Sequence, residues 1–274
     1  MVKFVEKLPT ENVMIVDALN LAFRWKHSGA LVFVNDYIST VDSLAKSYKC
    51  GTIIIAADKG KSWFRMELFP EYKGNRQKLR DKQTEKEKKE FKHFFEECNE
   101  LLKELEKRKS YIVLQYDNVE ADDIAAYVVE TRKDYGFNQV WLISSDRDWD
   151  LLIEKDVHRF SYVTRKEQTL LTWDNPVSIE EYLSYKVLVG DAGDNIPGIP
   201  QIGPKRATEL IKQYGSALDL YANLPIDSRY KYIQNLNENA DQILINQELM
   251  DLRTHCREAI GEENLKDIGR RLIF

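Results

Sequence analysis

The sequence contains little that would indicate a membrane or secreted protein. No apolar run approaches the roughly 20 residues that a membrane-spanning helix needs, and the N-terminal segment MVKFVEKLPTEN lacks the apolar stretch of a signal peptide. Only 3 cysteines occur in 274 residues, at Cys50, Cys98 and Cys256, and no Cys/His spacing typical of zinc sites is present. An odd number of widely separated cysteines predicts free thiols in a reducing cytoplasm. We therefore expect a cytoplasmic globular protein with no membrane association.

Carboxylates, in contrast, gather at the ends of apolar runs. Nine of them follow or flank such runs: Asp17, Asp58, Glu120, Asp122, Asp123, Asp146, Asp148, Asp191 and Asp194. The ends of parallel strands converge at one edge of a sheet, and carboxylates gathered there repel one another unless cations bind among them. Oxygen ligands of this kind suit Mg²⁺ or Mn²⁺ rather than zinc. The pattern predicts a site for two or more divalent ions that cleaves phosphodiester bonds.

The net charge of −5 does not exclude a nucleic-acid ligand. Without the nine carboxylates, 36 of the 45 acidic residues remain and face 40 basic ones. The negative charge is therefore concentrated in one predicted cleft, and the net charge of the whole chain is a poor guide to its partners.

Alternating strands and helices indicate the fold class. Four buried strands are predicted, with helices between them: strands at residues 12–17, 52–57, 111–115 and 139–144, and helices at 35–49, with Asn35 as N-cap, and 121–132. This order predicts an α/β fold with a central, mostly parallel sheet flanked by helices. Residues 1–175 would form this core, and residues 176–274, helical in character with no further clear strand, a second region.

One predicted helix, at residues 77–109, has an unusual composition. It contains no Gly or Pro, its first half is almost entirely charged, and its second half carries apolar residues at helical spacing. Two interpretations stay open: a solvated surface helix with i,i+4 ion pairs, or an element that projects and contacts a charged ligand.

Two acidic motifs carry more weight than a single Asp at a strand end, which usually caps a helix. The segment EADD places Glu120, Asp122 and Asp123 within one turn of a predicted helix start, and SSDRDWD follows another apolar strand. A positive helix terminus stabilises one or two carboxylates, but three within four positions repel one another.

The segment GIPQIGPKR has the G-h-x-x-h-G pattern of a helix–hairpin–helix. Gly198 and Gly203 would permit the tight turn, and Pro204 suits a first helical turn. The helix start could hold a phosphate, aided by Lys205 and Arg206. Such backbone contacts would bind DNA without regard to sequence. The alternative is an ordinary Gly/Pro connection, which would have a similar sequence pattern.

A basic segment, FPEYKGNR, precedes the charged helix. Tyr72 could stack on a base, and Lys73 and Arg76 could stabilise charge on the scissile phosphate. Surface charge is the alternative. Gly60-Lys61-Ser62 resembles the end of a Walker A loop, but position 55 is Ile rather than Gly, which excludes that motif.

Taken together, these segments resemble the flap endonuclease/5′-nuclease superfamily. The segments IVDALNLAFR, EYKGNR, VEADDIAAY, LISSDRDWD and GDAGDNIPGIPQIGPKR occur in the family's order between about residues 12 and 255. The chain looks most like the small stand-alone 5′–3′ exonucleases of T-odd coliphages and is also similar to the 5′-nuclease domain of bacterial DNA polymerase I. Host cytoplasm would be its location if it is phage-encoded.

The resemblance implies a helical arch at about residues 77–107, beneath which a 5′ flap passes, and a helix–hairpin–helix region that binds duplex DNA. It assigns Asp17, Asp58, Glu120, Asp122 and Asp123 to one metal ion and Asp146, Asp148, Asp191 and Asp194 to a second. Lys73, Arg76 and Tyr72 match catalytic positions at the base of the arch. Arg24 and Lys205 match positions that contact DNA, and a K⁺ site is implied near 199–203.

The resemblance also predicts the partners. DNA with 5′ flaps, nicks or free 5′ ends is the expected substrate of a Mg²⁺-dependent monomer serving replication, and RNA primers stay open as a further substrate. No segment that resembles the clamp-binding tail of cellular flap endonucleases is evident, so a sliding-clamp partner is not expected. The predicted arch lacks the dense aromatic content of some relatives. Two other functions stay open: a non-catalytic structure-specific DNA-binding protein, and a PIN-type ribonuclease.

Overall fold

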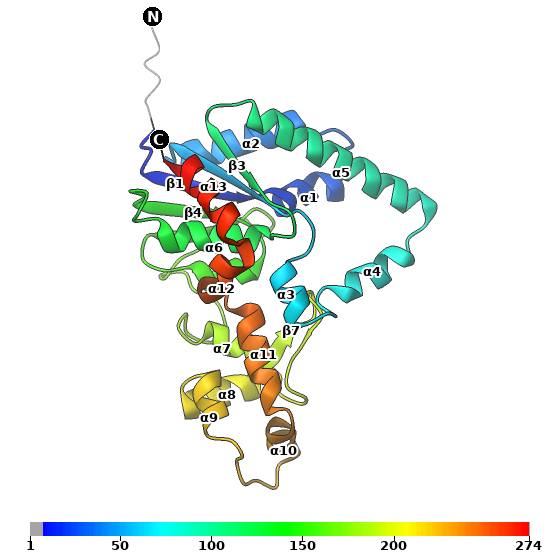
Figure 1. Ribbon diagram of the computed structural model, residues 1–274, viewed down its shortest axis with the longest axis vertical. Helices are drawn as coiled ribbons and strands as arrows, with labels where there is room; N and C mark the ends of the chain where they lie inside the picture. The colour runs from blue at the N-terminus through cyan, green and yellow to red at the C-terminus, as the bar shows by residue number, and fades with distance from the viewer. Residues whose placement is uncertain (1–7, 274) are drawn as a thin grey trace, which may run out of the picture.

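A six-stranded sheet forms the centre of the protein (Figure 1). The computed structural model describes residues 8–273, so the predictions for the extreme N-terminus and for the last residue lie partly outside the described range. The strands run in the order β3-β2-β1-β4-β5-β6, and only β6 is antiparallel to its neighbour. Their bounds are β1 Asn12–Asp17, β2 Thr52–Ala57, β3 Tyr111–Gln115, β4 Gln139–Ile143, β5 Val157–Ser161 and β6 Lys166–Gln168. The predicted α/β class is confirmed.

Helices cover both faces of this sheet because its central strands are apolar on both sides. All six residues of β2 are buried, as expected for a parallel strand between two helical layers. One core lies under α6 (Ala121–Thr131), α12 (Leu252–Ile260) and α13 (Glu262–Leu272). The other lies under α1 (Ala18–Ser28), α2 (Val34–Ser47) and the second half of α5 (Glu85–Glu106). The prediction of Asn35 as N-cap was wrong, because α2 begins at Val34 and follows Phe33, which makes no side-chain capping bond.

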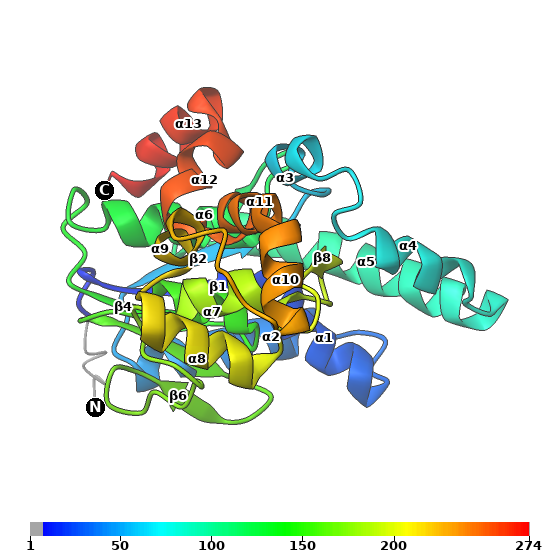
Figure 2. The ribbon, with the colours of Figure 1, turned by 90° about the horizontal axis from the view of Figure 1, so that it is seen from below.

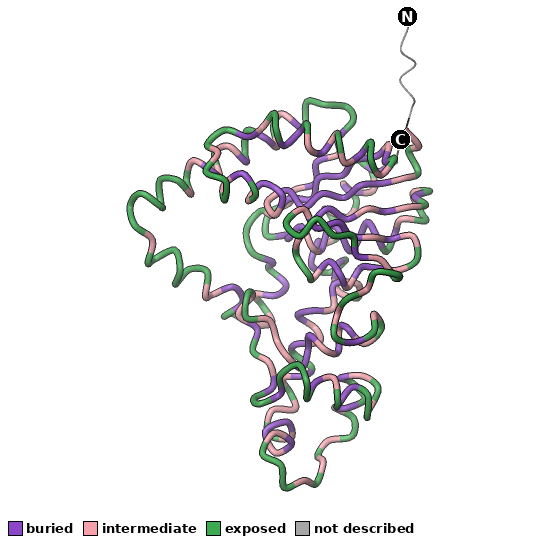
Figure 3. The backbone as a smooth tube through the Cα atoms, turned by 180° about the vertical axis from the view of Figure 1, so that it is seen from behind, coloured by how far each residue is buried: buried purple, intermediate pink, exposed green. Residues whose placement is uncertain are grey.

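The charged segment predicted as one helix forms two. Helix α4 (Gly74–Asp81) ends before Thr84, which starts α5 with a capping box. The Thr84 side chain accepts from the Glu87 backbone N–H, and Glu87 accepts from the Thr84 backbone N–H at 2.7 Å. Figures 1 and 2 show α4 and α5 extending from the body and meeting at a tip, and Figure 3 shows that most of this projection is exposed. The segment therefore projects, but its exposed face also carries the i,i+4 ion pairs of the other interpretation, Lys86 with Glu90 and Lys92 with Glu96. Contact with a charged ligand stays a prediction.

Residues beyond the sheet form a helical region with its own core. Its elements are α7 Tyr182–Val189, β7 Gly190–Asp191, β8 Ile196–Pro197, α8 Pro204–Tyr214, α9 Ala217–Ala222, α10 Lys231–Glu238 and α11 Ala240–Met250. The short β7–β8 pair is a correction, since no strand was expected there. Helix α12 returns to pack on α6, so the C-terminal segment also completes the sheet's core. The division at residue 175 stays a prediction.

Two short helices join these parts. Helix α3 (Trp63–Leu68) leads from β2 toward the projection, and the 3₁₀-helix η1 (Arg147–Leu152) follows β4. None of the helices that the structure describes in residues 8–273 has the length and apolar character to cross a membrane.

Candidate active site at the carboxyl edge of the sheet

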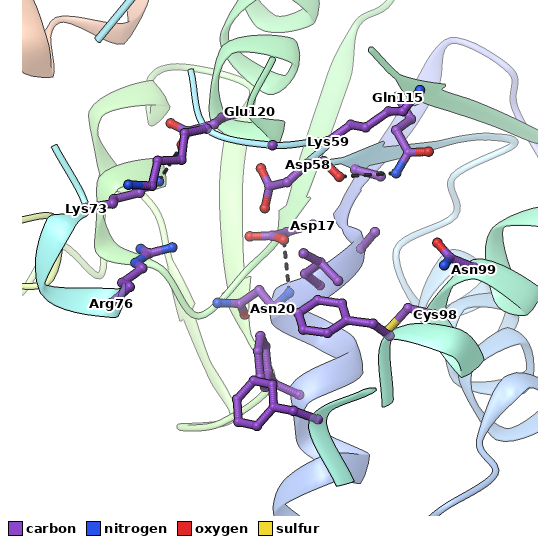
Figure 4. Close-up of a pocket in the computed structure, with 18 of the residues that line it drawn as sticks. Asp17, Asn20, Asp58, Lys59, Lys73, Arg76, Cys98, Asn99, Gln115 and Glu120 are labelled. Carbon is purple, nitrogen blue, oxygen red and sulfur yellow. Dashed lines mark hydrogen bonds and ion pairs between the residues drawn. The ribbon is translucent and has the colours of Figure 1, made fainter. Parts of the chain in front are cut away.

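The carboxyl ends of four parallel strands surround one cavity. Asp17 ends β1, Asp58 follows β2, Glu120 and Asp122 follow β3, and Asp146 follows β4. The chain adds β2 and β3 on one side of β1 and then β4 on the other, so the direction in which strands are added reverses between β1 and β4. Crevices that bind ligands form at such switch points. All five carboxylates line a cavity of about 750 Å³, together with Lys73 and Arg76. Figure 4 shows Asp17 and Asp58 close together, with their carboxylates pointing toward the side of the cavity where Lys73 and Arg76 lie.

Four of these carboxylates have no cationic partner in the part of the chain that the structure describes. The ion pairs of residues 8–273 include none to Asp17, Asp58, Asp122 or Asp146. Burial and the nearby charge of Asp58 raise the pKa of Asp17 to about 8. Loss of solvent around the carboxylate and the charge of Asp148 raise the pKa of Asp146 to about 6. These two carboxyl groups therefore hold their protons more tightly than usual when no cation is bound beside them.

Short hydrogen bonds orient three of these four carboxylates. Asp17 caps α1 through the Asn20 N–H at 3.0 Å and accepts from the Ser144 hydroxyl at 2.9 Å. Asp58 accepts from the Ala121 N–H at 2.7 Å, and Asp122 from Trp149 Nε1 at 2.6 Å. Burial is also the main cause that raises the pKa values of Asp58 and Asp122. These bonds engage both oxygens of Asp17 but only Oδ1 of Asp58 and of Asp122.

Glu120 and Asp194, in contrast, are paired with the basic segment. Lys73 Nζ donates to Glu120 at 2.8 Å, and Arg76 donates to Asp194 at 2.7 Å. The Tyr72 hydroxyl donates to both carboxylates, at 2.8 and 3.0 Å. Burial opposes ionisation of Glu120, but the charges of Lys73 and Arg65 outweigh it and lower its pKa. The expectation that Tyr72 stacks on a base was wrong, because its ring is 1% exposed; the tyrosine instead orients two carboxylates.

A lysine that the sequence analysis missed joins two further predicted ligands. Lys186 donates to Asp148 and, at 3.0 Å, to Asp191. Its ammonium group is nearly buried and lies between two carboxylates, as a metal ion would. The signal in the sequence was a charged residue inside the apolar run YKVLV of α7.

Asp123 does not face the cavity. It is fully buried, and its two oxygens accept from Arg65 at 2.8 and 2.9 Å. Arg65 also donates to the Leu249 carbonyl at 3.0 Å, which ties α3 to α6 and α11. Asp123 therefore pairs with Arg65 and is not among the residues that line the cavity.

The residues predicted to bind DNA lie outside the cavity. The Arg24 guanidinium stacks on Tyr162, 4.2 Å from its ring centroid. Lys205 and Arg206 are exposed on the first turn of α8, which has no side-chain cap. Arg206 donates to the Gln201 carbonyl at 2.6 Å and covers Tyr232. These positions suit contacts away from the carboxylates.

The two hairpin glycines have different roles from those expected. Neither has a left-handed backbone; the positive φ in this turn belongs to Gln201. A Cβ on Gly198 would lie 2.1 Å from the Val189 carbonyl, so close backbone packing requires this glycine. A Cβ on Gly203 would meet no atom within 4 Å, which leaves the start of α8 open.

The oxygen-rich lining fits hard divalent ions bound partly through water. Within residues 8–273, no three Asp, Glu, His or Cys side chains converge closely enough to hold an ion by themselves. The carboxylates instead line the cavity from several strand ends. Mg²⁺ usually keeps several of its waters and takes only one or two carboxylates directly, so this donor chemistry fits it.

Two family models match nearly the whole chain. The 5′-3′ exonuclease N-terminal resolvase-like domain matches residues 12–182, and the 5′-3′ exonuclease C-terminal SAM fold matches residues 177–269. The chain belongs to the 5′-3′ exonuclease family. As a member of this family it is an enzyme, so the alternative of a non-catalytic DNA-binding protein is wrong.

Similar members of the 5′-3′ exonuclease family support a flap endonuclease activity. The flap endonuclease of Escherichia phage T5 is 43% identical over 268 residues, covering 94% of this chain and 91% of the relative. DNA polymerase I of Bacillus caldotenax is 32% identical over 79% of this chain, which spans only 24% of that relative. By this homology the protein is a flap endonuclease and 5′-3′ exonuclease, and the PIN-type alternative is set aside.

Solved structures of the phage T5 enzyme share the fold. A complex of that flap endonuclease with DNA and metal ions gives a TM-score of 0.90 at 41% identity, covering 95% of this chain and 97% of that one. A structure of the T5 5′-exonuclease with bound zinc also gives 0.90 at 41% identity, covering 95% and 98%.

Proposed function

We propose that the protein hydrolyses phosphodiester bonds of branched or 5′-ended duplex DNA with two Mg²⁺ or Mn²⁺ ions. One observation carries this proposal: four carboxylates that form no ion pair within residues 8–273 line a cavity at the root of the projecting helices. The phage T5 relative was solved with DNA and metal ions, which supports the same ligands here. The products would carry 5′-phosphate and 3′-hydroxyl ends.

The first ion would be held by Asp17, Asp58, Asp122 and Asp146, several of them through water. The second would be held by Asp148, Asp191 and Asp194 after Lys186 and Arg76 give up their contacts with these groups. Divalent ions at these positions would polarise the scissile phosphate and supply a reactive water at neutral pH. Glu120, which accepts hydrogen bonds from Lys73 and Tyr72, would orient the basic side chains at the base of the arch. Asp123 would serve only to stabilise the fold.

The basic pair would act on the substrate. Lys73 is held at the cavity wall by Glu120, and Arg76 is half-exposed beside Asp194. From there both can approach a phosphate, and preoriented donors stabilise the charge that develops on it. A 5′ flap would pass beneath α4 and α5. Duplex would lie along Arg24, Gly203, Lys205 and Arg206, with K⁺ bound by the hairpin backbone near Gly198.

A labelled 5′-flap duplex tests this function. Wild-type protein is expected to release one short labelled product in Mg²⁺ or Mn²⁺ and none in EDTA. Asp146→Asn should bind the flap but not cut it. Cleavage that persists in EDTA, or no cleavage in either metal, contradicts the proposal. Nicked, recessed and RNA-flap substrates in the same assay give the substrate range, and sedimentation tests the predicted monomer.

A further inference from the structure

Two adjacent aspartates in the first turn of α6 are held by different kinds of donor. Asp123 accepts from the charged guanidinium of Arg65 at 2.8 and 2.9 Å and is not among the residues that line the cavity. Asp122 lines the cavity and accepts from the neutral indole of Trp149, with 2.6 Å between Nε1 and Oδ1. A cation neutralises the carboxylate beside it, whereas a neutral N–H orients a carboxylate and leaves its charge in place. Asp122 is therefore oriented while its charge stays available to a metal ion.

Packing explains where the Trp149 ring lies but not where its N–H points. The ring is fully buried in the core under α6 and α12, and a phenyl ring would be equally apolar there. The indole nitrogen is a donor only, and its hydrogen has one fixed direction in the ring plane. Within residues 8–273, the side-chain hydrogen bond of Asp122 engages Oδ1 and not Oδ2. The indole thus holds one oxygen of this carboxylate and leaves the other for a different partner.

The turn that carries Trp149 is firmly held. Arg159 donates to the fully buried Asp150 at 2.5 Å, directly after the tryptophan. At the start of the turn, Asp146 caps η1 by accepting from the Asp148 N–H at 2.9 Å. One short segment therefore supplies two proposed metal ligands and the donor that orients a third. The position of the indole N–H is fixed relative to these ligands.

We propose that Trp149 is a positioning residue of the metal-dependent reaction. Its N–H holds Oδ1 of Asp122 so that Oδ2 is presented to a divalent ion. Groups that orient metal ligands in this way typically contribute roughly 10–100-fold to metal affinity or activity. Trp149 acts through Asp122 and touches neither the ion nor the DNA. This inference rests on the proposed function, in which Asp122 binds the first ion.

Metal affinity measured apart from cleavage tests this role. Trp149→Phe keeps a buried ring but removes the N–H. Trp173→Phe is the matched control, because it removes an indole hydrogen bond of 2.7 Å to the Val177 carbonyl and Trp173 is not among the residues that line the cavity. Calorimetry of Mn²⁺ binding to the DNA-free protein should show a dissociation constant raised roughly 10–100-fold in Trp149→Phe and unchanged in Trp173→Phe.

The dependence of cleavage on metal concentration gives a second readout. Trp149→Phe should cut a 5′ flap slowly at low Mg²⁺ and recover toward the wild-type rate at high Mg²⁺, because the variant lacks affinity rather than a reacting group. Its binding of the flap in EDTA should equal that of wild type. A loss of rate that high Mg²⁺ does not reduce would overturn the proposal.

A double-mutant cycle with Asp122→Asn tests whether Trp149 acts through this carboxylate. Residues that act as one unit are not additive, so Trp149→Phe should change the Mn²⁺ affinity little once Asp122 is replaced. The proposal is overturned if Trp149→Phe binds Mn²⁺ as tightly as wild type or if the two single losses multiply in the double variant. An equal loss in Trp173→Phe also overturns it.

Misfolding and a failure of the proposed function give different results. Melting temperatures in EDTA identify a variant that folds poorly. In that case benzothienylalanine at position 149, which has sulfur in place of the N–H, keeps the ring shape and should show the same loss of Mn²⁺ affinity; wild-type affinity in that protein overturns the proposal. If wild type binds Mn²⁺ but cuts no flap in Mg²⁺ or Mn²⁺, the proposed function fails, while the affinities still decide the role of Trp149.

Discussion

Lys73 donates to Glu120 at 2.8 Å, and this buried ion pair lies where the projection joins the body. The lysine backbone is left-handed, with φ of 53°, and its N–H donates to the Asp194 carbonyl at 2.8 Å. A strained conformation of this kind persists when its surroundings hold it firmly. Lys73 is thus fixed through both its backbone and its side chain beside the cavity.

Lys73→Ala should lower the cleavage rate more than it weakens DNA binding. Loss of a preoriented donor to a developing charge costs on the order of 100-fold in kcat. Single-turnover cleavage and flap binding would be compared with Lys59→Ala, since Lys59 lines the same cavity but is exposed and pairs with Asp117. Equal losses of cleavage rate and of DNA affinity would mean that Lys73 contributes to DNA binding and not to the chemical step.

Asp123→Asn and Asp146→Asn should have opposite effects. The first removes the partner of the buried Arg65, and breaking a buried pair costs about 3–5 kcal/mol of unfolding free energy. The second removes a proposed ligand and should abolish cleavage without lowering stability. Denaturant unfolding and Mg²⁺ titration would measure both. If the Asp123→Asn protein is as stable as wild type but binds no Mg²⁺, Asp123 is a metal ligand after all.

Without divalent ions, the protein should lose stability as pH rises. The pKa of Asp17 is about 8 in the folded protein and 3.8 ordinarily, so the folded state holds its proton more tightly than the unfolded state. That contribution is fully present below pH 3.8 and is lost as pH rises through about 8. In EDTA, Asp17→Asn should raise the melting temperature more at pH 8 than at pH 5. An equal shift at both pH values would contradict the raised pKa of Asp17, which is caused mainly by burial and then by the charge of Asp58.

Lys186→Met should destabilise the protein mainly when divalent ions are absent. The substitution leaves Asp148 and Asp191 without their shared cation, at a cost of about 3 kcal/mol. Because Mg²⁺ would bind the same carboxylates, it should recover much of that loss. Melting curves in EDTA and in Mg²⁺ test this, with Lys231→Met, exposed in the helical region, as the control. The same loss of stability in EDTA and in Mg²⁺ would mean that no ion binds between Asp148 and Asp191.

Gly198→Ala and Gly203→Ala separate packing from DNA contact in the hairpin. The first places a Cβ against the Val189 carbonyl and should cost about 1–3 kcal/mol of stability. The second meets no protein atom and should leave stability within about 0.5 kcal/mol, while weakening duplex binding. Unfolding curves and duplex binding measure the two effects. Unchanged duplex affinity in Gly203→Ala would remove the start of α8 from the interface.

The strands and the acidic edge were readable from the sequence for a common reason. Buried parallel strands are continuous apolar runs such as TIIIAA, and the residue after each run lies at the sheet's edge. The break at Thr84 was also readable, since T-E-K-E is a capping-box pattern that the analysis overlooked.

The pairing of charges could not be predicted in this way. Arg65 and Asp123 are 58 positions apart, and Lys186 reaches Asp148 across 38 positions. Nothing local distinguishes a carboxylate that an arginine neutralises from one that stays unpaired. Which of the nine acids are available to a cation depends on tertiary packing alone.

The contacts of Asp194 with Tyr72, Lys73 and Arg76 also bear on how the enzyme is made. Synthesis releases the strands and the basic segment first, while Asp191 and Asp194 emerge from the ribosome much later. If these two residues bind metal as proposed, the growing polypeptide should lack a complete centre, and therefore cleavage activity, until its helical portion appears.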